Sequence, residues 1–216
     1  MPTHPLAALP DGRRPRISSG FGPRTMPNGK VVKHVGADIS FAAVAGDPPP
    51  KLVKGRVVYT ANRSKAFFSP AGRAVHASEA GVVVQAKKKP RIGGDVWIHH
   101  TATGRVTRYA HLSRIDVKEG ERVGEGQRLG IWGAGARTPF VHLHFELLRA
   151  GVKNSQTDPR AYLDGADVLG AESATPPTRP NLAVTPRGAT AAAGLPGGAI
   201  WLLLLLAIGA RRSTRS

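Results

Sequence analysis

Residues 142–147 (HLHFEL) alternate polar and apolar side chains strictly. In a β-strand successive side chains point to opposite faces, so His142, His144 and Glu146 share one face and three hydrophobic residues share the other. Two neighbouring imidazoles are typical of a metal site or of acid–base catalysis. A plain polar sheet surface is the alternative for this stretch taken alone. We therefore predict a strand that buries its hydrophobic face and presents two histidines together.

A second stretch, residues 31–40 (VVKHVGADIS), is rich in β-forming residues and places His34 and Asp38 on one face. Gly36 lies between them and has no side chain, so we expect room there for an ion or a substrate backbone. A chance HxxxD string on a polar strand is the alternative.

His111 ends a third predicted strand, residues 105–111. Two histidines and one carboxylate are a usual ligand set for catalytic zinc, and they leave a position for water. The chain has no cysteine, which excludes disulfides and thiolate ligands. Of the other histidines, His4 lies in the expected leader, and three are expected on the surface or in packing roles: His76, His99 and His100.

Short apolar runs separated by glycine, proline and charged turns must position these residues. This pattern is typical of an antiparallel all-β sheet or sandwich. Asn28–Gly29 predicts a hairpin turn, and no long helical period competes with the strands. The expected strands with the clearest pattern are residues 74–77, 81–86, 96–100 and 105–111.

With 216 residues, the chain has room for one ordinary domain and its tails. We expect a mobile leader over 1–16, a domain over 17–165 with an insertion loop or hairpin at 46–70, an Ala/Pro/Thr-rich disordered linker over 166–198 and a hydrophobic tail over 199–216.

The net charge of +17 fits an anionic partner: nucleic acid, a membrane surface or an acidic polymer such as a bacterial cell wall. Aromatic residues make up only 6% of the chain, and no nucleic-acid-binding motif is present. We therefore exclude nucleic acid as the expected partner. The sequence predicts no oligomeric state.

Four ordered motifs together resemble the M23 family of zinc metallopeptidases, of the LytM/lysostaphin type. They are SGFGPR (19–24), HVGAD (34–38), YAHLS (109–113) and HLHFE (142–146), and the resemblance spans residues 17–163. It implies an all-β domain of the LytM type that hydrolyses peptide cross-links of bacterial peptidoglycan. Two departures, TPFV at 138–141 and the long 46–70 segment, bear on substrate fit.

The same resemblance implies one Zn²⁺ per chain, held by His34, Asp38 and His144, and a catalytic role for His111 and His142. One imidazole would be the general base and the other would stabilise the oxyanion or donate a proton, and which does which stays open. Glu146 is either an acceptor that orients an imidazole or a surface carboxylate. A non-catalytic M23-like module that binds the wall or regulates another hydrolase is the alternative function.

Residues 199–210 are continuously apolar and precede Arg211–Arg212. A spanning helix needs about 20 apolar residues, so this run is short unless residues 189–198 are added. We predict a C-terminal hydrophobic helix that anchors the chain in a membrane, with the arginines inside and the enzyme facing outward in the bacterial envelope. That topology calls for an export signal, and residues 1–16 contain no apolar run that would serve as one.

Overall fold

A computed structural model describes residues 1–26, 28–47, 51–53, 56–59, 67–70, 72–134 and 140–169, with only the backbone described at 51–53 and 56–59. The predicted tail 199–216 and most of the predicted linker lie outside these residues. Within the described part of the chain, no helix is long and apolar enough to cross a membrane.

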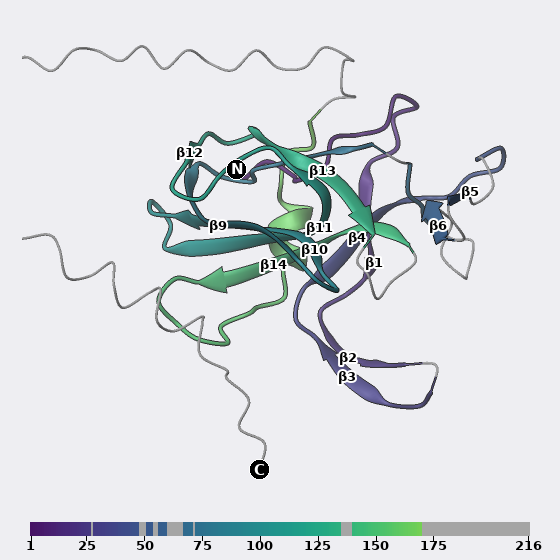
Figure 1. Cartoon of the computed structure of the whole chain (residues 1–216), viewed down its shortest axis with the longest axis horizontal. Coiled ribbons are helices and arrows are strands. Elements are labelled where there is room, and N and C mark those ends of the chain that lie inside the picture. Colours follow the sequence, from purple (N-terminus) through teal and green to yellow (C-terminus); the bar gives the residue numbers. More distant parts are fainter. Residues whose placement is uncertain are drawn as a thin grey trace, which may run out of the picture. The chain divides into compact units, whose positions relative to one another are not determined.

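Almost all regular structure is antiparallel β-sheet, which confirms the predicted all-β class (Figure 1). The strands are β1 (Pro15–Ser19), β2 (Gly22–Thr25), β3 (Val31–His34), β4 (Ala37–Ala42), β5 (Lys51–Val53), β6 (Arg56–Tyr59), β7 (Phe67–Phe68), β8 (Ala74–His76), β9 (Gly81–Lys89), β10 (Gly93–His100), β11 (Arg105–Ile115), β12 (Arg122–Val123), β13 (Arg128–Ala134) and β14 (Val141–Arg149). The described residues add one short helix, α1 (Arg160–Asp164).

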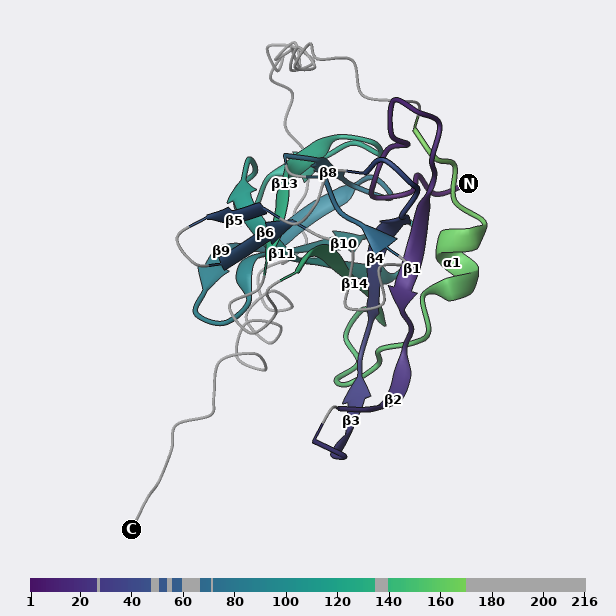
Figure 2. The same cartoon turned by 90° about the vertical axis from the view of Figure 1, so that its right-hand side faces the viewer.

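One large sheet runs in the order β1-β4-β14-β13-β11-β10-β9-β12, with β7 paired to β4 and β8 paired to β13. Strand β14 is its hub, because it pairs with β4 and β13 and also with β11. Figure 2 shows β1, β4 and β14 side by side. The strand with the HxH pattern is thus placed between the strands that contain the other candidate residues.

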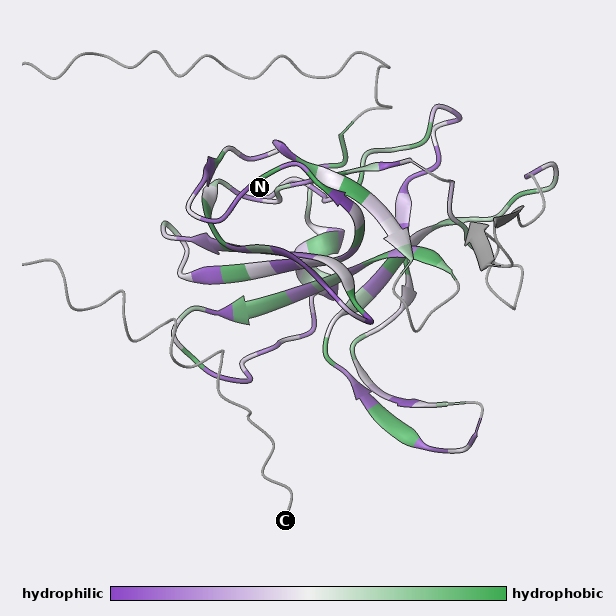
Figure 3. Cartoon of the chain, in the orientation of Figure 1, coloured by the Kyte–Doolittle hydropathy of each residue, from purple (hydrophilic) through white to green (hydrophobic). Residues whose placement is uncertain are grey.

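Hydrophobic side chains from both sides of β14 fill the core. Leu143 and Phe145 are fully buried, as predicted, whereas Leu147 is half-buried. Tyr109 meets the Phe145 ring edge-on at 5.4 Å between centroids. Figure 3 shows hydrophobic and hydrophilic segments alternating along the strands. Each fully buried large side chain stabilises the fold by about 1.5–3 kcal/mol, so the core fixes the position of β14.

The N-terminal segment differs from the predicted mobile leader. Leu6 and Leu9 are buried, and backbone N–H groups of Thr3 and His4 donate to the carbonyls of Ser78 and Asp167 at 2.8 and 2.7 Å. Prolines prevent the segment from forming a helix or an inner strand, but they leave its leucines free to fill a gap in the core. Tertiary packing therefore orders a stretch without a secondary-structure pattern of its own.

Two hairpins lie outside the main sheet. The predicted Asn28–Gly29 turn joins β2 and β3, with Gly29 at a φ of 78°. Part of the 46–70 segment forms the β5–β6 pair, and Phe67–Phe68 returns to pair with β4. The remainder of that segment, at 48–50, 54–55 and 60–66, lies outside the described residues.

Candidate metal centre

Three side-chain atoms converge where β3, β4 and β14 meet. His34 Nε2 lies 3.1 Å from Asp38 Oδ1 and 3.1 Å from His144 Nδ1, and His144 Nδ1 lies 2.9 Å from Asp38 Oδ1. Two ligands of a tetrahedral zinc ion lie about 3.3 Å apart, given bonds of about 2.0–2.1 Å. The spacing and the donor types therefore fit a zinc ion, on the three residues that the sequence predicts as its ligands.

Strand pairing accounts for this convergence. His34 ends β3, and Asp38 follows near the start of β4, where it lies directly opposite His144 of β14. On an antiparallel pair, opposite side chains on one face lie about 4.5–5.5 Å apart at Cβ. Residues more than a hundred positions apart in the sequence thus come within bonding distance of one ion.

Hydrogen bonds assign each ligand histidine the nitrogen it offers. His34 Nδ1 lies 2.6 Å from the Gly20 carbonyl oxygen, so this nitrogen donates and Nε2 faces the site. His144 is turned the other way, because its Nε2 lies 3.1 Å from Glu146 Oε1 and leaves Nδ1 for the ion. An acceptor on the second ring nitrogen is the usual way in which proteins orient metal-binding histidines.

Gly36 serves a different purpose from the one we predicted. A Cβ at this position would collide with the Phe145 carbonyl oxygen and would lie 3.0 Å from His144 Nε2. The space above Gly36 is therefore filled by β14 and is not open to an ion or a substrate. The missing side chain lets β14 approach closely enough for His144 to reach Asp38.

Charge reinforces the cluster. Burial disfavours the charged form of Asp38, but hydrogen bonds from His144 and His34 outweigh burial and hold the pKa of its carboxyl far below the usual range. Burial likewise acts to lower the pKa of His144, but Asp38 and Glu146 reverse this effect and raise it to about 9 in the metal-free protein. An anionic Asp38 between two imidazoles favours a bound cation.

His111 and His142 lie beside this cluster, with ring centroids 4.7 Å apart and the rings edge-on. Their Nδ1 atoms lie 2.7 and 2.9 Å from the carbonyl oxygens of Ile92 and Phe140. Each ring therefore donates from Nδ1 and keeps a lone pair on Nε2. His142 Nε2 lies 3.5 Å from Asp38 Oδ1, so the lone pair of this ring points into the site.

Both rings of this pair are neutral at pH 7. Burial, together with the nearby His142, lowers the pKa of His111 to about 4. Burial also lowers the pKa of His142, although Asp38 opposes the shift. His111 has a φ of 69°, a backbone conformation that non-glycine residues adopt at a cost and that clusters at functional sites.

Glu146 accepts from His144 and is fully buried, so it is an acceptor that orients the His144 imidazole and not a surface carboxylate.

Two arginines that sequence reasoning missed also contact the site. Arg24 Nη1 lies 3.3 Å from Asp38 Oδ2, and Arg108 donates to Glu146. The SGFGPR motif contains Arg24, and Arg108 directly precedes the YAHLS motif, so proximity to motifs was the available signal.

The other four histidines lie away from the cluster, and the described residues include no second metal-type group. Three are buried in packing or hydrogen-bonding roles: His4, His76 and His100. His99 is half-buried on β10. The positions of His76, His99 and His100 agree with the predicted surface or packing roles, whereas His4 is buried and not part of a mobile leader.

Comparison with known proteins finds similarity to peptidases, among other proteins. Residues 60–159 match the family described as "Peptidase family M23". That range contains His111, His142 and His144, whereas His34 and Asp38 precede it in the chain and are brought beside His144 by the fold. The chain is 36% identical over 138 residues to peptidoglycan DD-endopeptidase ShyA of Vibrio cholerae, covering 63% of this chain and 25% of the relative.

Two solved structures resemble the fold. A zinc-containing peptidase from Vibrio cholerae is 29% identical, with a TM-score of 0.50 over 77% of this chain and 41% of the other. Lysostaphin from Staphylococcus simulans, at 22% identity, shares the fold with a TM-score of 0.52 over 84% of this chain and 62% of its own. The chain spans about a quarter to a third of the length of the curated relatives it matches first.

Proposed function

We propose that the chain, whose residues 60–159 match peptidase family M23, is a zinc-dependent endopeptidase that hydrolyses peptide cross-links of bacterial peptidoglycan. The single observation that best supports the proposal is the convergence of all five predicted residues: His34, Asp38 and His144 around one point, with His111 and His142 beside it. A module that had lost catalysis would have no need to keep both imidazoles next to an intact ligand set.

The residues divide the chemistry between them. Zinc, when bound by His34, Asp38 and His144, supplies a Lewis acid that polarises a peptide carbonyl and lowers the pKa of water to about 7. His111 and His142 lie side by side and each keep an unprotonated Nε2, so either can accept the proton of the attacking water. Return of that proton to the leaving amine nitrogen completes the hydrolysis.

The backbone carbonyls of Ile92 and Phe140 hold these two rings in the tautomer that general-base catalysis needs. The lowered pKa of His111, caused by burial and by His142, keeps this ring unprotonated well below neutral pH. Proton transfer therefore does not depend on a carboxylate base.

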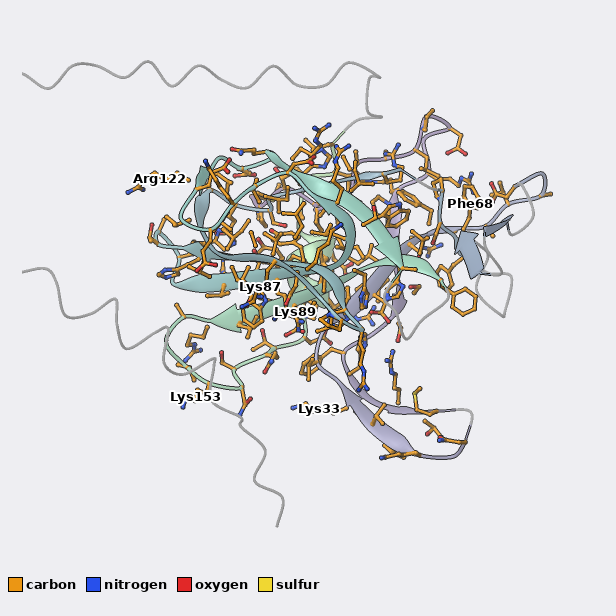
Figure 4. The ribbon with its side chains drawn as sticks, viewed as in Figure 1. Lys33, Phe68, Lys87, Lys89, Arg122 and Lys153 are labelled. Carbon is orange, nitrogen blue, oxygen red and sulfur yellow. The ribbon has the colours of Figure 1, made fainter. Side chains whose placement is uncertain are left out.

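Surface charge supports an anionic polymer as substrate. Exposed cations lie on several elements around the described domain, and Figure 4 labels Lys33, Lys87, Arg122 and Lys153 among them. A positive surface attracts the acidic groups of a bacterial wall and raises the local concentration of substrate. We propose that the chain acts in the cell envelope and that residues 199–216 anchor it, because residues 199–210 are continuously apolar and precede Arg211–Arg212. Membrane fractionation of cells that express the full chain or a chain ending at residue 198 tests the anchor.

Purified protein tests the enzymatic proposal directly. We expect about one zinc ion per chain by metal analysis, release of soluble fragments from purified walls, loss of release on chelation and its recovery on adding zinc. His144→Ala is the matched control and should lack both metal and activity. Zinc binding without cleavage of any wall type, combined with wall binding, would instead favour the non-catalytic module.

A further inference from the structure

A row of charged side chains crosses three strands behind the metal centre. Arg108 of β11 lies directly opposite Glu146 of β14 on one side and opposite Trp97 of β10 on the other. Its guanidinium donates from Nη1 to Glu146 Oε1, the same oxygen that lies 3.1 Å from His144 Nε2. The row thus begins at a predicted zinc ligand and leads away from the site.

Asp95 holds the far side of Arg108. The Asp95 carboxylate accepts from Arg108 Nε at 2.7 Å and from Nη2 at 3.3 Å. It also accepts from Gln85, Lys89 and the Trp97 indole at 2.9, 2.6 and 3.0 Å. The guanidinium carbon lies 5.1 Å from the Trp97 ring centroid, which stacks the planar group in place. Arg108 is therefore fixed on all sides and has little freedom to release Glu146.

Burial makes this arrangement costly. The side chains of Asp95 and Glu146 are both 0% exposed and that of Arg108 is 14% exposed. Buried ion pairs contribute little net stability, because desolvation offsets most of their attraction, and apolar residues of similar size often serve a core better. The buried row of Asp95, Arg108 and Glu146 is therefore better explained by its effect on the orientation of His144 than by its contribution to stability.

We propose that Arg108 is a positioning residue for the zinc site: held by Asp95, it fixes Glu146 against His144 Nε2 and so holds Nδ1 of His144 towards Asp38 and His34. This inference rests on the proposed function. It adds to it the prediction that zinc affinity depends on two residues, Arg108 and Asp95, that touch neither the ion nor a ligand. Second acceptors of metal-binding histidines typically change metal affinity about 10- to 100-fold when lost.

Zinc dissociation constants of the full chain, measured by competition with a chromophoric chelator, test the proposal. Arg108→Gln and Asp95→Asn should each raise the zinc Kd, Arg108→Gln by about 10- to 100-fold. Arg108→Lys keeps the charge and one donor and should recover part of the affinity. Arg114→Gln is the matched control, because Arg114 lies on the same strand but pairs with Asp116 at the surface, with 57% of its side chain exposed. It should bind zinc as the wild type does.

Glu146→Gln covers the case in which Arg108→Gln fails to fold, since it leaves the Arg108–Asp95 pair intact and replaces only the charged acceptor. The visible spectrum of the cobalt(II)-substituted protein adds a readout that general loss of stability would not move. It should change in Glu146→Gln and Arg108→Lys but not in Arg114→Gln. Wild-type zinc affinity and an unaltered cobalt spectrum in folded Arg108 and Glu146 variants would overturn the inference. A wild type that binds no zinc would overturn the proposed function itself.

Discussion

His142 and His144 are two residues apart on one strand, yet different kinds of groups hold their rings. His144 lies between two carboxylates, those of Asp38 and Glu146. The ring of His142 donates to the carbonyl oxygen of Phe140, and its neighbour His111 donates to that of Ile92. On the proposed ligand side the ring of His144 is thus held by two charged groups, and on the proposed catalytic side the rings of His111 and His142 each donate from Nδ1 to a neutral backbone carbonyl.

This difference matches the work proposed for each side. A carboxylate next to an imidazole raises its pKa and its basicity, which favours binding of a cation. A backbone carbonyl fixes the tautomer while burial keeps the ring neutral, which favours proton transfer. Two histidines from one strand can therefore do separate chemistry, because carboxylates of Asp38 and Glu146 lie beside one ring and the Phe140 backbone carbonyl holds the other.

Loss of a ligand should have the largest effect and should separate the two sides most clearly. Asp38→Ala removes the anion shared by His34 and His144, so we expect bound zinc and wall cleavage both to fall to background. Metal analysis and release of wall fragments measure the two quantities. Retention of a full equivalent of zinc by Asp38→Ala would contradict the division into two sides.

Loss of a catalytic imidazole should leave the metal in place. His111→Gln and His142→Gln should each lower kcat by about 10²- to 10⁴-fold, the range typical of general acid–base groups. Zinc content should stay near one per chain, because neither Nε2 belongs to the ligand cluster. Steady-state kinetics on a soluble cross-linked peptide, alongside metal analysis of the same samples, would check this. Loss of zinc in either variant would show that the substituted histidine takes part in metal binding, and it would contradict the division of the site into two sides.

Stability against pH should show opposite signs for the two sides in the metal-free protein. The pKa of His144 is raised to about 9, so its contribution is complete below about pH 6.5 and is lost as pH rises through 9. The pKa of His111 is lowered to about 4, so its contribution is complete above about pH 6.5 and is lost as pH falls towards 4. Each shift corresponds to at most about 3 kcal/mol.

Denaturant unfolding across this pH range measures both limbs. His144→Gln should flatten the alkaline limb and His111→Gln the acid limb. The lowered pKa values of Asp38 and Glu146 add a further loss of stability at more acidic pH, where these carboxylates become protonated. Identical limbs in both variants would show that the two histidines do not differ as described.

The smallest effect is expected at Gly36, which belongs to neither side but sets their spacing. Gly36→Ala places a methyl group against the Phe145 carbonyl and 3.0 Å from His144 Nε2. Overpacking of this kind typically costs about 1–3 kcal/mol, and here it should also weaken zinc binding by moving β14 away from β4. Thermal unfolding and zinc titration measure the two effects. As a control, Gly124→Ala, where a Cβ would meet nothing within 4 Å, should leave zinc binding unchanged.

Much of the site could be predicted from the sequence because its residues lie in short strands with a clear alternation. The period of two places His142 and His144 on one face, and the four motifs indicate which distant residues join them. Arg108 and Asp95 could not be predicted in the same way. The contacts of Arg108 with Glu146 and with Asp95 depend on which residues of β10, β11 and β14 lie opposite each other, and local pattern does not set that register.

The N-terminal segment, residues 1–16, is a second case in which the local sequence did not predict the structure. Its prolines and short apolar stretches predict a mobile leader, but Leu6 and Leu9 are buried against elements that the local sequence does not reveal. Burial of apolar surface depends on what lies nearby in space, and for this segment the partners include residues near 78 and 167.

By itself the sequence determined the all-β class, the alternation of β14 and the five candidate residues that the structure brings together. Tertiary structure alone decided which nitrogen each histidine offers, because that choice depends on acceptors from Gly20, Ile92, Phe140 and Glu146. It also decided that Gly36 is a point of close strand approach and that the polar face of β14 is buried. The local sequence gives the type of each side chain. The orientation and charge state of the histidines depend instead on groups that strand pairing brings near them.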